Sequence, residues 1–149
     1  MVSWSSSWRP ISDPPVRSSV SLRVLVVGDQ RVADLLCDEL CTAGHDTYAA
    51  HSGLSGLLMA EKRRPEIILI DLALPDLDGI DLANAIRSTE DLKEMVLIAL
   101  SGHAKEQAYW EARGMAIDRY LVKPIKLPQL ANLIQATWRS TREEQFSKR

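Results

Sequence analysis

The sequence predicts an α/β protein in which a parallel five-stranded sheet is covered by helices on both faces. Three observations lead to this prediction. Short apolar runs alternate with segments of helical periodicity through the central part of the 149-residue chain. The third of these runs is apolar at nearly every position, which is typical of a strand buried on both faces. The chain is also long enough to build one core of its own.

The elements expected in the first half of the chain follow from its apolar periodicity. β-branched side chains are enriched in the strand segments, whereas apolar side chains recur every three or four residues in the helical segments. Gly44 and Pro65 are typical of positions just after a helix. Ser52 is a favourable N-terminal cap for the second helix. The expected elements are the strand 22–27, the helix 31–43, the strand 47–50, the helix that Ser52 caps and that runs to Arg64, and the strand 66–70.

The second half continues the same alternation. Pro128 suits the first turn of the last helix, where the missing amide hydrogen has no partner to lose. Right-handed crossovers through the helices join such parallel strands. The expected elements are the helix 80–88, the strand 95–100, the helix 104–113, the strand 120–122 and a last helix from Pro128 to about residue 146.

Two flanking segments differ from this central domain. Residues 1–21 mix Ser, Pro and Arg without periodicity, and we expect a disordered leader there. Residues 22–138 form the expected domain. Residues 139–149 are polar and charged, and we expect them to extend the last helix as a tail.

The composition is that of an ordinary soluble protein, with 46% hydrophobic and 26% charged residues. Basic side chains gather near both ends of the chain, so the excess of acid falls on the central part. An acidic body argues against a broad nucleic-acid surface and suits a domain that holds a cation. No apolar stretch is long enough to span a membrane or to act as a signal peptide. We therefore expect neither a nucleic-acid nor a membrane partner.

The cysteines and histidines show no metal-binding pattern. Cys37 and Cys41 lie four residues apart in a helical segment, on one face of the helix, and no second pair is present for zinc. Free thiols are typical of a reducing compartment, so we expect a cytoplasmic protein. His45 and His51 lack ligand spacing and are expected to be exposed loop residues.

Polar side chains follow four of the expected strands at the point where each strand ends. Asp29, Asp71, Ser101 and Lys123 follow the first, third, fourth and fifth strands. Because the carboxyl ends of parallel strands meet at one edge of a sheet, these side chains should converge there. Each has an ordinary explanation when taken alone; Asp29, for instance, is also a favourable helix cap. Their coincidence at equivalent positions indicates a functional site.

The chemistry of these groups suits phosphoryl transfer. Mg²⁺ usually takes one or two carboxylates together with waters and phosphate oxygens, and Asp29 and Asp71 supply two carboxylates. Once Asp71 accepts a phosphoryl group, the Lys123 ammonium and the Ser101 hydroxyl can neutralise or hydrogen-bond its oxygens. The small Gly102 beside the hydroxyl leaves space for the incoming group.

Several motifs resemble those of bacterial response regulator receiver domains. The run 71–79, D-L-A-L-P-D-L-D-G, resembles the phosphoacceptor motif of that family. Residues 26–29 resemble its acidic first-strand end, residues 100–102 its switch hydroxyl, and residues 120–124 its Lys-Pro signature. The resemblance covers about residues 22–138 in the order and spacing of the family.

The resemblance implies a doubly wound, flavodoxin-like fold with strand order 2-1-3-4-5. It implies that Asp71 is phosphorylated by a phosphohistidine on a histidine kinase or a phosphotransfer protein. Asp29, Asp71 and the backbone carbonyl of Ala73 would hold Mg²⁺. Ser101 and Tyr120 would couple phosphorylation to a change in the face made by the last two helices and the last strand.

The resemblance also bears on partners and on the Lys123–Pro124 bond, which is often cis in such domains. The partners would be the phosphodonor protein, a downstream target and a second copy of the chain in a homodimer. The domain would assist its own phosphorylation and dephosphorylation without being a conventional enzyme.

One departure from the family pattern concerns the metal. Gly28 stands where the family usually carries the first of two adjacent acids. The missing carboxylate predicts weaker Mg²⁺ binding, with Asp29 still present.

Two alternatives remain open from the sequence. The chain could be a degenerate receiver that acts as a docking or dimerisation module without phosphorylation, and Gly28 is the feature that favours this. The second alternative is a small hydrolase or a nucleotide-binding protein. It is disfavoured because Ala73 stands where an aspartyl-nucleophile phosphatase needs a second Asp, and because no G-x-G-x-x-G follows the first strand.

Overall fold

Five parallel strands form one sheet in the order β2-β1-β3-β4-β5, which is the predicted order. The structure is a computed structural model, and it describes residues 20–102, 108, 111 and 117–147. Within these residues the elements are β1 Arg23–Val27, α2 Gln30–Thr42, β2 Asp46–Ala50, α3 Gly53–Arg63, β3 Ile67–Asp71, α4 Gly79–Ser88, β4 Val96–Ser101, β5 Arg119–Val122 and α6 Leu127–Ser147. The expected helix 104–113 lies almost wholly outside the described residues, as does most of the expected leader.

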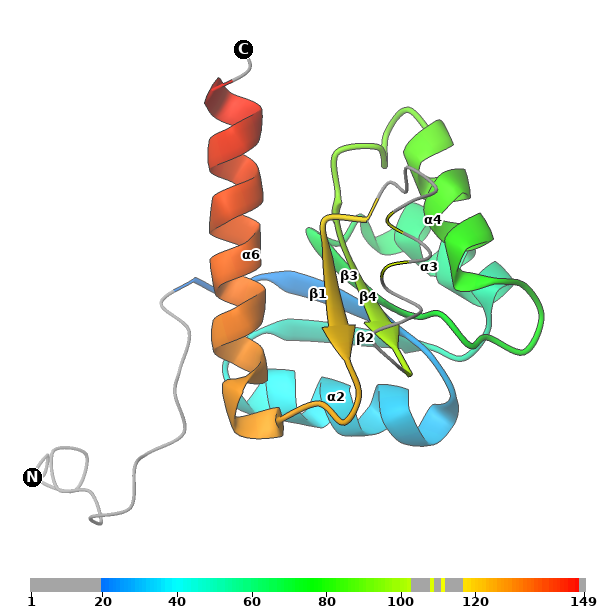
Figure 1. The fold of residues 1–149 in the computed structure, drawn as a ribbon, viewed down its shortest axis with the longest axis horizontal. Helices are drawn as coiled ribbons and strands as arrows, with labels where there is room; N and C mark the ends of the chain where they lie inside the picture. Colours follow the sequence, from blue (N-terminus) through cyan, green and yellow to red (C-terminus); the bar gives the residue numbers. More distant parts are fainter. Residues whose placement is uncertain (1–19, 103–107, 109–110, 112–116, 148–149) are drawn as a thin grey trace, which may run out of the picture.

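The described helices cover both faces of the sheet, as the apolar runs predicted. Helices α2 and α6 pack on one face, and helices α3 and α4 pack on the other (Figure 1). Side chains of the strands alternate between these two cores. Val24 and Val26 of β1 belong to the core under α2 and α6, whereas Leu25 and Val27 belong to the core under α3 and α4. Every residue of β3, the central strand, is buried.

Polar side chains set the starts of three helices. Asp29 caps α2 and accepts a hydrogen bond from the Val32 amide, while Ser52 caps α3 and Asp78 caps α4. The capping role expected for Asp29 is thus confirmed. Each cap ends a short connection from the carboxyl end of a strand, so these connections bring polar residues to one edge of the sheet.

The last helix is much longer than the other described helices. At 21 residues, α6 spans roughly 30 Å, and its C-terminal part extends past the sheet (Figure 1). Leu130 and Ile134 pack fully against the core, and Trp138 is partly buried beside it. None of the helices in the described part of the chain combines the length and the apolar character needed to cross a membrane.

One expectation about the histidines is wrong. His45 is only 4% exposed, and its Nδ1 accepts a hydrogen bond from the Leu22 amide over 3.0 Å. The turn after α2 folds back onto the start of β1, which buries the imidazole. His51 is exposed, as expected, and its Nε2 lies 3.4 Å from Asp34 Oδ1.

Candidate phosphoacceptor site

Asp71 and Lys123 meet at the carboxyl end of the sheet. Asp71 is the last residue of β3 and is 3% exposed. Its Oδ2 lies 2.7 Å from the Nζ of Lys123, which follows β5 and keeps a partly exposed side chain. The other carboxylate oxygen, Oδ1, accepts a hydrogen bond from the Ala73 amide over 3.0 Å. The carboxylate therefore sits in a pocket of donors with a cation at one side, although 52 residues separate it from Lys123.

Lys123 is positioned by the backbone on both sides. Its amide donates to the carbonyl of Ser101 over 2.8 Å, which continues the β4–β5 pairing by one residue. The peptide bond that follows, Lys123–Pro124, is cis, as the resemblance implied. These features place the start of the lysine side chain beside the end of β4.

Ser101 is the last residue of β4 and is fully buried. In the register of the sheet, Asp71 pairs with Leu100, so Ser101 lies one step beyond the pair, at the same end of the sheet. Ser101 also pairs with Val122, the residue before Lys123. The fold thus brings the predicted phosphoacceptor Asp71 and the two predicted phosphoryl-contacting residues, Ser101 and Lys123, to the ends of three adjacent strands.

Gly28 and Asp29 follow β1, so they lie at the same edge of the sheet as Asp71, Ser101 and Lys123. A side chain at residue 28 would meet Asp71, since a Cβ there would lie 3.3 Å from the Asp71 Cβ and 3.8 Å from its Oδ2. Asp29, the next residue, is exposed and uses Oδ1 to accept from the Val32 amide over 2.9 Å. One carboxylate is buried and one is at the surface, so only Asp29 is freely accessible to solvent ions.

The donor set can be compared with what a metal ion needs. No group of three or more His, Cys, Asp or Glu side chains arranged for a metal is present in the described ranges. Mg²⁺ does not require such a group, because it commonly uses one or two carboxylates and completes its shell with water and phosphate oxygens. Asp29, Asp71 and the Ala73 carbonyl are all hard oxygen donors. The residues therefore fit Mg²⁺ with one carboxylate fewer than an acid at residue 28 would provide.

Tyr120 lies on β5 opposite Ala99 of β4. It packs against a small apolar cluster that contains Leu72, Ile80 and Ala99. Its hydroxyl is buried, with no hydrogen-bond partner among the described residues, and burial raises the pKa of the phenol, with Glu111 adding to the effect. Leu72, a member of that cluster, directly follows Asp71 in the chain.

The sequence did not reveal the part played by Asp76. Its carboxylate accepts hydrogen bonds from the amides of Gly53 and Leu54 at the start of α3, over 2.7 and 3.0 Å. These bonds are long-range, and nothing in the run 71–79 indicates a partner in the preceding helix. The one available signal was Gly53, because a residue without a side chain lets another segment approach closely.

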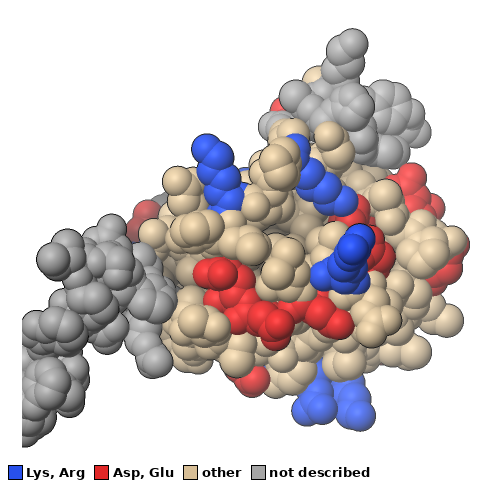
Figure 2. Space-filling view, turned by 90° about the horizontal axis from the view of Figure 1, so that it is seen from below, with Lys and Arg blue, Asp and Glu red and all other residues tan. Residues whose placement is uncertain are grey.

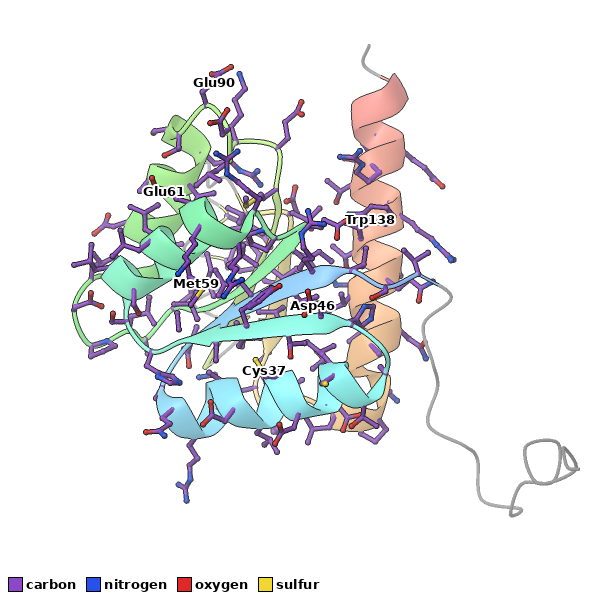
Figure 3. All side chains as sticks on the ribbon, turned by 180° about the vertical axis from the view of Figure 1, so that it is seen from behind. Cys37, Asp46, Met59, Glu61, Glu90 and Trp138 are labelled. Carbon is purple, nitrogen blue, oxygen red and sulfur yellow. The ribbon has the colours of Figure 1, made fainter. Side chains whose placement is uncertain are left out.

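The surface around α2 carries a marked charge pattern. Seen from the side on which α2 lies in Figure 1, acidic side chains form a band across the described surface, with basic side chains around it (Figure 2). Asp34 and Asp38 of α2 are both exposed. Cys37 of the same helix faces β2, and its Sγ lies 3.4 Å from the carbonyl oxygen of Tyr48 (Figure 3).

Comparison with known proteins agrees with the fold. Residues 24–135 match the profile of the response regulator receiver domain. Response regulator MprA of Mycobacterium bovis is 35% identical over 127 residues, a match that covers 84% of this chain and 54% of that protein. The chain thus spans about half the length of the curated relatives that it matches.

Solved structures with the same fold include two receiver proteins. Chemotaxis response regulator CheY4 of Vibrio cholerae is 23% identical, with a TM-score of 0.73 over 79% of this chain and 99% of CheY4. The receiver domain of the sensor histidine kinase PA1611 of Pseudomonas aeruginosa is 27% identical, with a TM-score of 0.70 over 80% of this chain and 98% of that domain. The latter structure is described with a magnesium ion coordinated in the active site cleft. Profile match, sequence identity and fold together show that this chain belongs to the response regulator receiver domain family of two-component signalling systems.

Proposed function

We propose that Asp71 accepts a phosphoryl group from a phosphohistidine and that this modification switches a protein-binding face. The observation that carries the proposal is the contact of 2.7 Å between the buried Asp71 carboxylate and the Lys123 ammonium, at the edge where Ser101 and Asp29 also lie. A buried carboxylate with a cation beside it is poised to become an acyl phosphate, because the cation neutralises charge both before and after transfer.

The chemistry can be written with the residues of this chain. A carboxylate oxygen of Asp71 forms a bond to phosphorus while the bond from phosphorus to the donor imidazole nitrogen breaks, and that nitrogen keeps the electron pair. Lys123 stabilises the negative charge on the phosphoryl oxygens. The Ser101 hydroxyl donates to one of them. Bound Mg²⁺, held by Asp29, Asp71 and the Ala73 carbonyl, would neutralise further charge on the same oxygens.

The output of the proposed switch involves Tyr120 and Ser101. The hydroxyl of Tyr120 is buried without a hydrogen-bond partner among the described residues, and Tyr120 pairs with Ala99, two residues before Ser101 on the neighbouring strand. In this proposal, Ser101 moves toward the phosphoryl group and Tyr120 repacks against the space that is vacated. The face that β5 and α6 help to form then changes and binds a downstream target protein or a second copy of the chain.

The wider setting follows from the same proposal. The donor is a histidine kinase or a histidine phosphotransfer protein, and the chain works in the cytoplasm, where its two free cysteines remain reduced. Residues 22–138 are the functional unit in this proposal, and the part of α6 from residue 139 to Ser147 lies beyond it. Catalysis is limited to the domain's own phosphorylation and dephosphorylation.

The test is chemical phosphorylation of the full chain. Incubation with Mg²⁺ and acetyl phosphate should add the mass of one phosphoryl group, and the adduct should be stable to acid and labile to base. Asp71→Asn should abolish the adduct, whereas Asp81→Asn, at an exposed acid in the first turn of α4, should leave it unchanged. An adduct that persists in Asp71→Asn would refute the acceptor assignment. No adduct in the wild-type protein, with this donor or with a phosphohistidine protein, would favour the docking-module alternative.

A further inference from the structure

The loop between β3 and α4 is attached at its middle to the start of a different helix. Asp76, halfway along this loop, accepts hydrogen bonds from the amides of Gly53 and Leu54 in α3, over 2.7 and 3.0 Å. The two partners are 23 and 22 residues away in the sequence. A loop that would otherwise be held only at its ends therefore has a third fixed point.

These two hydrogen bonds complete the N-terminus of α3. The Ser55 amide donates to the Ser52 hydroxyl, and the Ser52 amide donates to the Ser55 hydroxyl, so the helix satisfies these groups itself. The amides of Gly53 and Leu54 are the remaining donors of the first turn, and the Asp76 carboxylate accepts from both. A negative charge is favourable at this end of a helix. The same amides lower the pKa of Asp76, so the carboxylate stays ionised.

Steric packing provides a second, independent contact between the loop and the helix. A Cβ on Gly53 would lie 2.4 Å from Cδ1 and 2.6 Å from Cγ of Leu77, distances that no side chain can occupy without moving the leucine. Leu77 is itself packed against the core under α3 and α4. The backbone of α3 at Gly53 thus lies directly against the loop, with no space between them.

This loop carries part of the proposed phosphoacceptor site. Ala73 lies three residues before Asp76, and its amide donates to Asp71 Oδ1 over 3.0 Å. We infer that Asp76 is a positioning residue, which anchors the loop to α3 and so fixes the Ala73 carbonyl relative to the Asp71 carboxylate for Mg²⁺ binding. The inference rests on the proposed function, since the carbonyl matters only if the site binds Mg²⁺. In this inference Asp76 acts through the loop backbone and is not a ligand of the metal or of the phosphoryl group.

The experiment compares three variants of the full chain. Asp76→Ala removes both bonds to α3, and Asp76→Asn keeps one carbonyl oxygen that can accept one of them. Ser55→Ala is the matched control, because it weakens the same helix N-terminus without touching the loop. Urea unfolding measures how much each variant destabilises the fold. Mg²⁺ affinity is measured by calorimetry without a phosphodonor, and the rate of adduct formation from acetyl phosphate is measured across Mg²⁺ concentrations.

The expected results distinguish an effect of Asp76 on Mg²⁺ binding from an effect on the stability of the fold. Asp76→Ala should weaken Mg²⁺ binding about three- to tenfold, below the usual range for a residue in contact with a metal ligand, because Asp76 acts through the loop backbone. Asp76→Asn should fall between Asp76→Ala and the wild type. Ser55→Ala should lose stability but bind Mg²⁺ like the wild type. In Asp76→Ala, the slower phosphorylation should be recovered at saturating Mg²⁺.

Two results would overturn the inference in distinguishable ways. If the wild type forms the Asp71 adduct and Asp76→Ala binds Mg²⁺ with the same affinity as Ser55→Ala, the site is functional and Asp76 does not position it. If the wild type itself binds no Mg²⁺ and forms no adduct, the proposed function fails and the inference fails with it.

Discussion

Gly28 lies directly against Asp71, so close that a Cβ at residue 28 would be 3.3 Å from the Cβ of the aspartate. Gly28 directly follows β1 and Asp71 ends β3, and these two strands pair from Val24 to Val27 of β1. An acid at residue 28 would place a second carboxylate next to that of Asp71. Glycine leaves that position without charge. The first prediction follows from this contact.

Gly28→Asp should bind Mg²⁺ more tightly than the wild type. The added carboxylate supplies one more anionic oxygen near the proposed ion, and we expect about a tenfold gain in affinity, well below the Coulomb ceiling for one extra charge. Calorimetric titration with Mg²⁺ measures this affinity. Gly28→Ala introduces the same tight Cβ contact without the charge and should not gain affinity. Equal affinities of the two variants would show that the missing acid does not limit metal binding.

Lys123→Ala should destabilise the folded protein in the absence of Mg²⁺. The substitution leaves the buried Asp71 carboxylate without its cation, and we expect a loss of about 1–3 kcal/mol in the free energy of unfolding, limited by the partial exposure of the lysine. Urea unfolding at neutral pH provides the measurement.

The double variant Lys123→Ala/Asp71→Asn tests whether the unpaired charge of Asp71 causes this loss of stability. Asp71→Asn in the Lys123→Ala background should recover most of the lost stability, because a neutral amide needs no cation. Lys126→Ala, at an exposed lysine three residues away, is the control and should have little effect. Failure of Asp71→Asn to restore stability would mean that the lysine contributes through packing instead.

His45 should make the stability of the protein decrease in mild acid. Burial lowers the pKa of His45 from its ordinary value of 6.5, with Glu66 opposing the shift, so the folded state binds fewer protons than the unfolded state. The free energy of unfolding should therefore be largest above pH 6.5 and fall as the pH drops from 6.5 toward the folded pKa, by about 1.4 kcal/mol per pH unit at most.

His45→Asn isolates this effect, because its Oδ1 can still accept from the Leu22 amide. The difference in unfolding free energy between pH 7.5 and pH 5.5 should be smaller in this variant than in the wild type. His51→Asn, at an exposed histidine, should behave like the wild type. Identical pH profiles for the wild type and His45→Asn would rule out His45 as the source.

The two cysteines should differ strongly in reactivity. Burial raises the pKa of Cys37 to about 11, with Asp34 and Asp38 adding to the effect, whereas Cys41 is exposed at the next turn of α2. Since the thiolate is the reactive form, iodoacetamide at pH 8 should label Cys41 well before Cys37. Mass spectrometry of digested protein gives both rates, and urea should make them similar. Faster labelling of Cys37 in the folded protein would contradict its burial against β2.

The sequence by itself determined the fold class and the edge at which the site lies. The run 66–70, apolar at every position after Glu66, is typical of a strand buried on both faces, and the alternation with helical segments favours a parallel sheet. Because strand ends of a parallel sheet share one edge, the positions of Asp71, Ser101 and Lys123 in the sequence were enough to bring them together. These arguments depend on local periodicity and chain order, which a sequence records directly.

Only the tertiary structure decided the contacts between residues far apart in the chain. The burial of His45 depends on how the turn after α2 folds onto β1, and the anchoring of Asp76 depends on how closely α3 approaches the loop 72–78. Neither contact follows from periodicity, because each depends on the packing of two elements that are 22 or 23 residues apart. The sequence specified which groups reach the site, and packing decided how firmly they are held there.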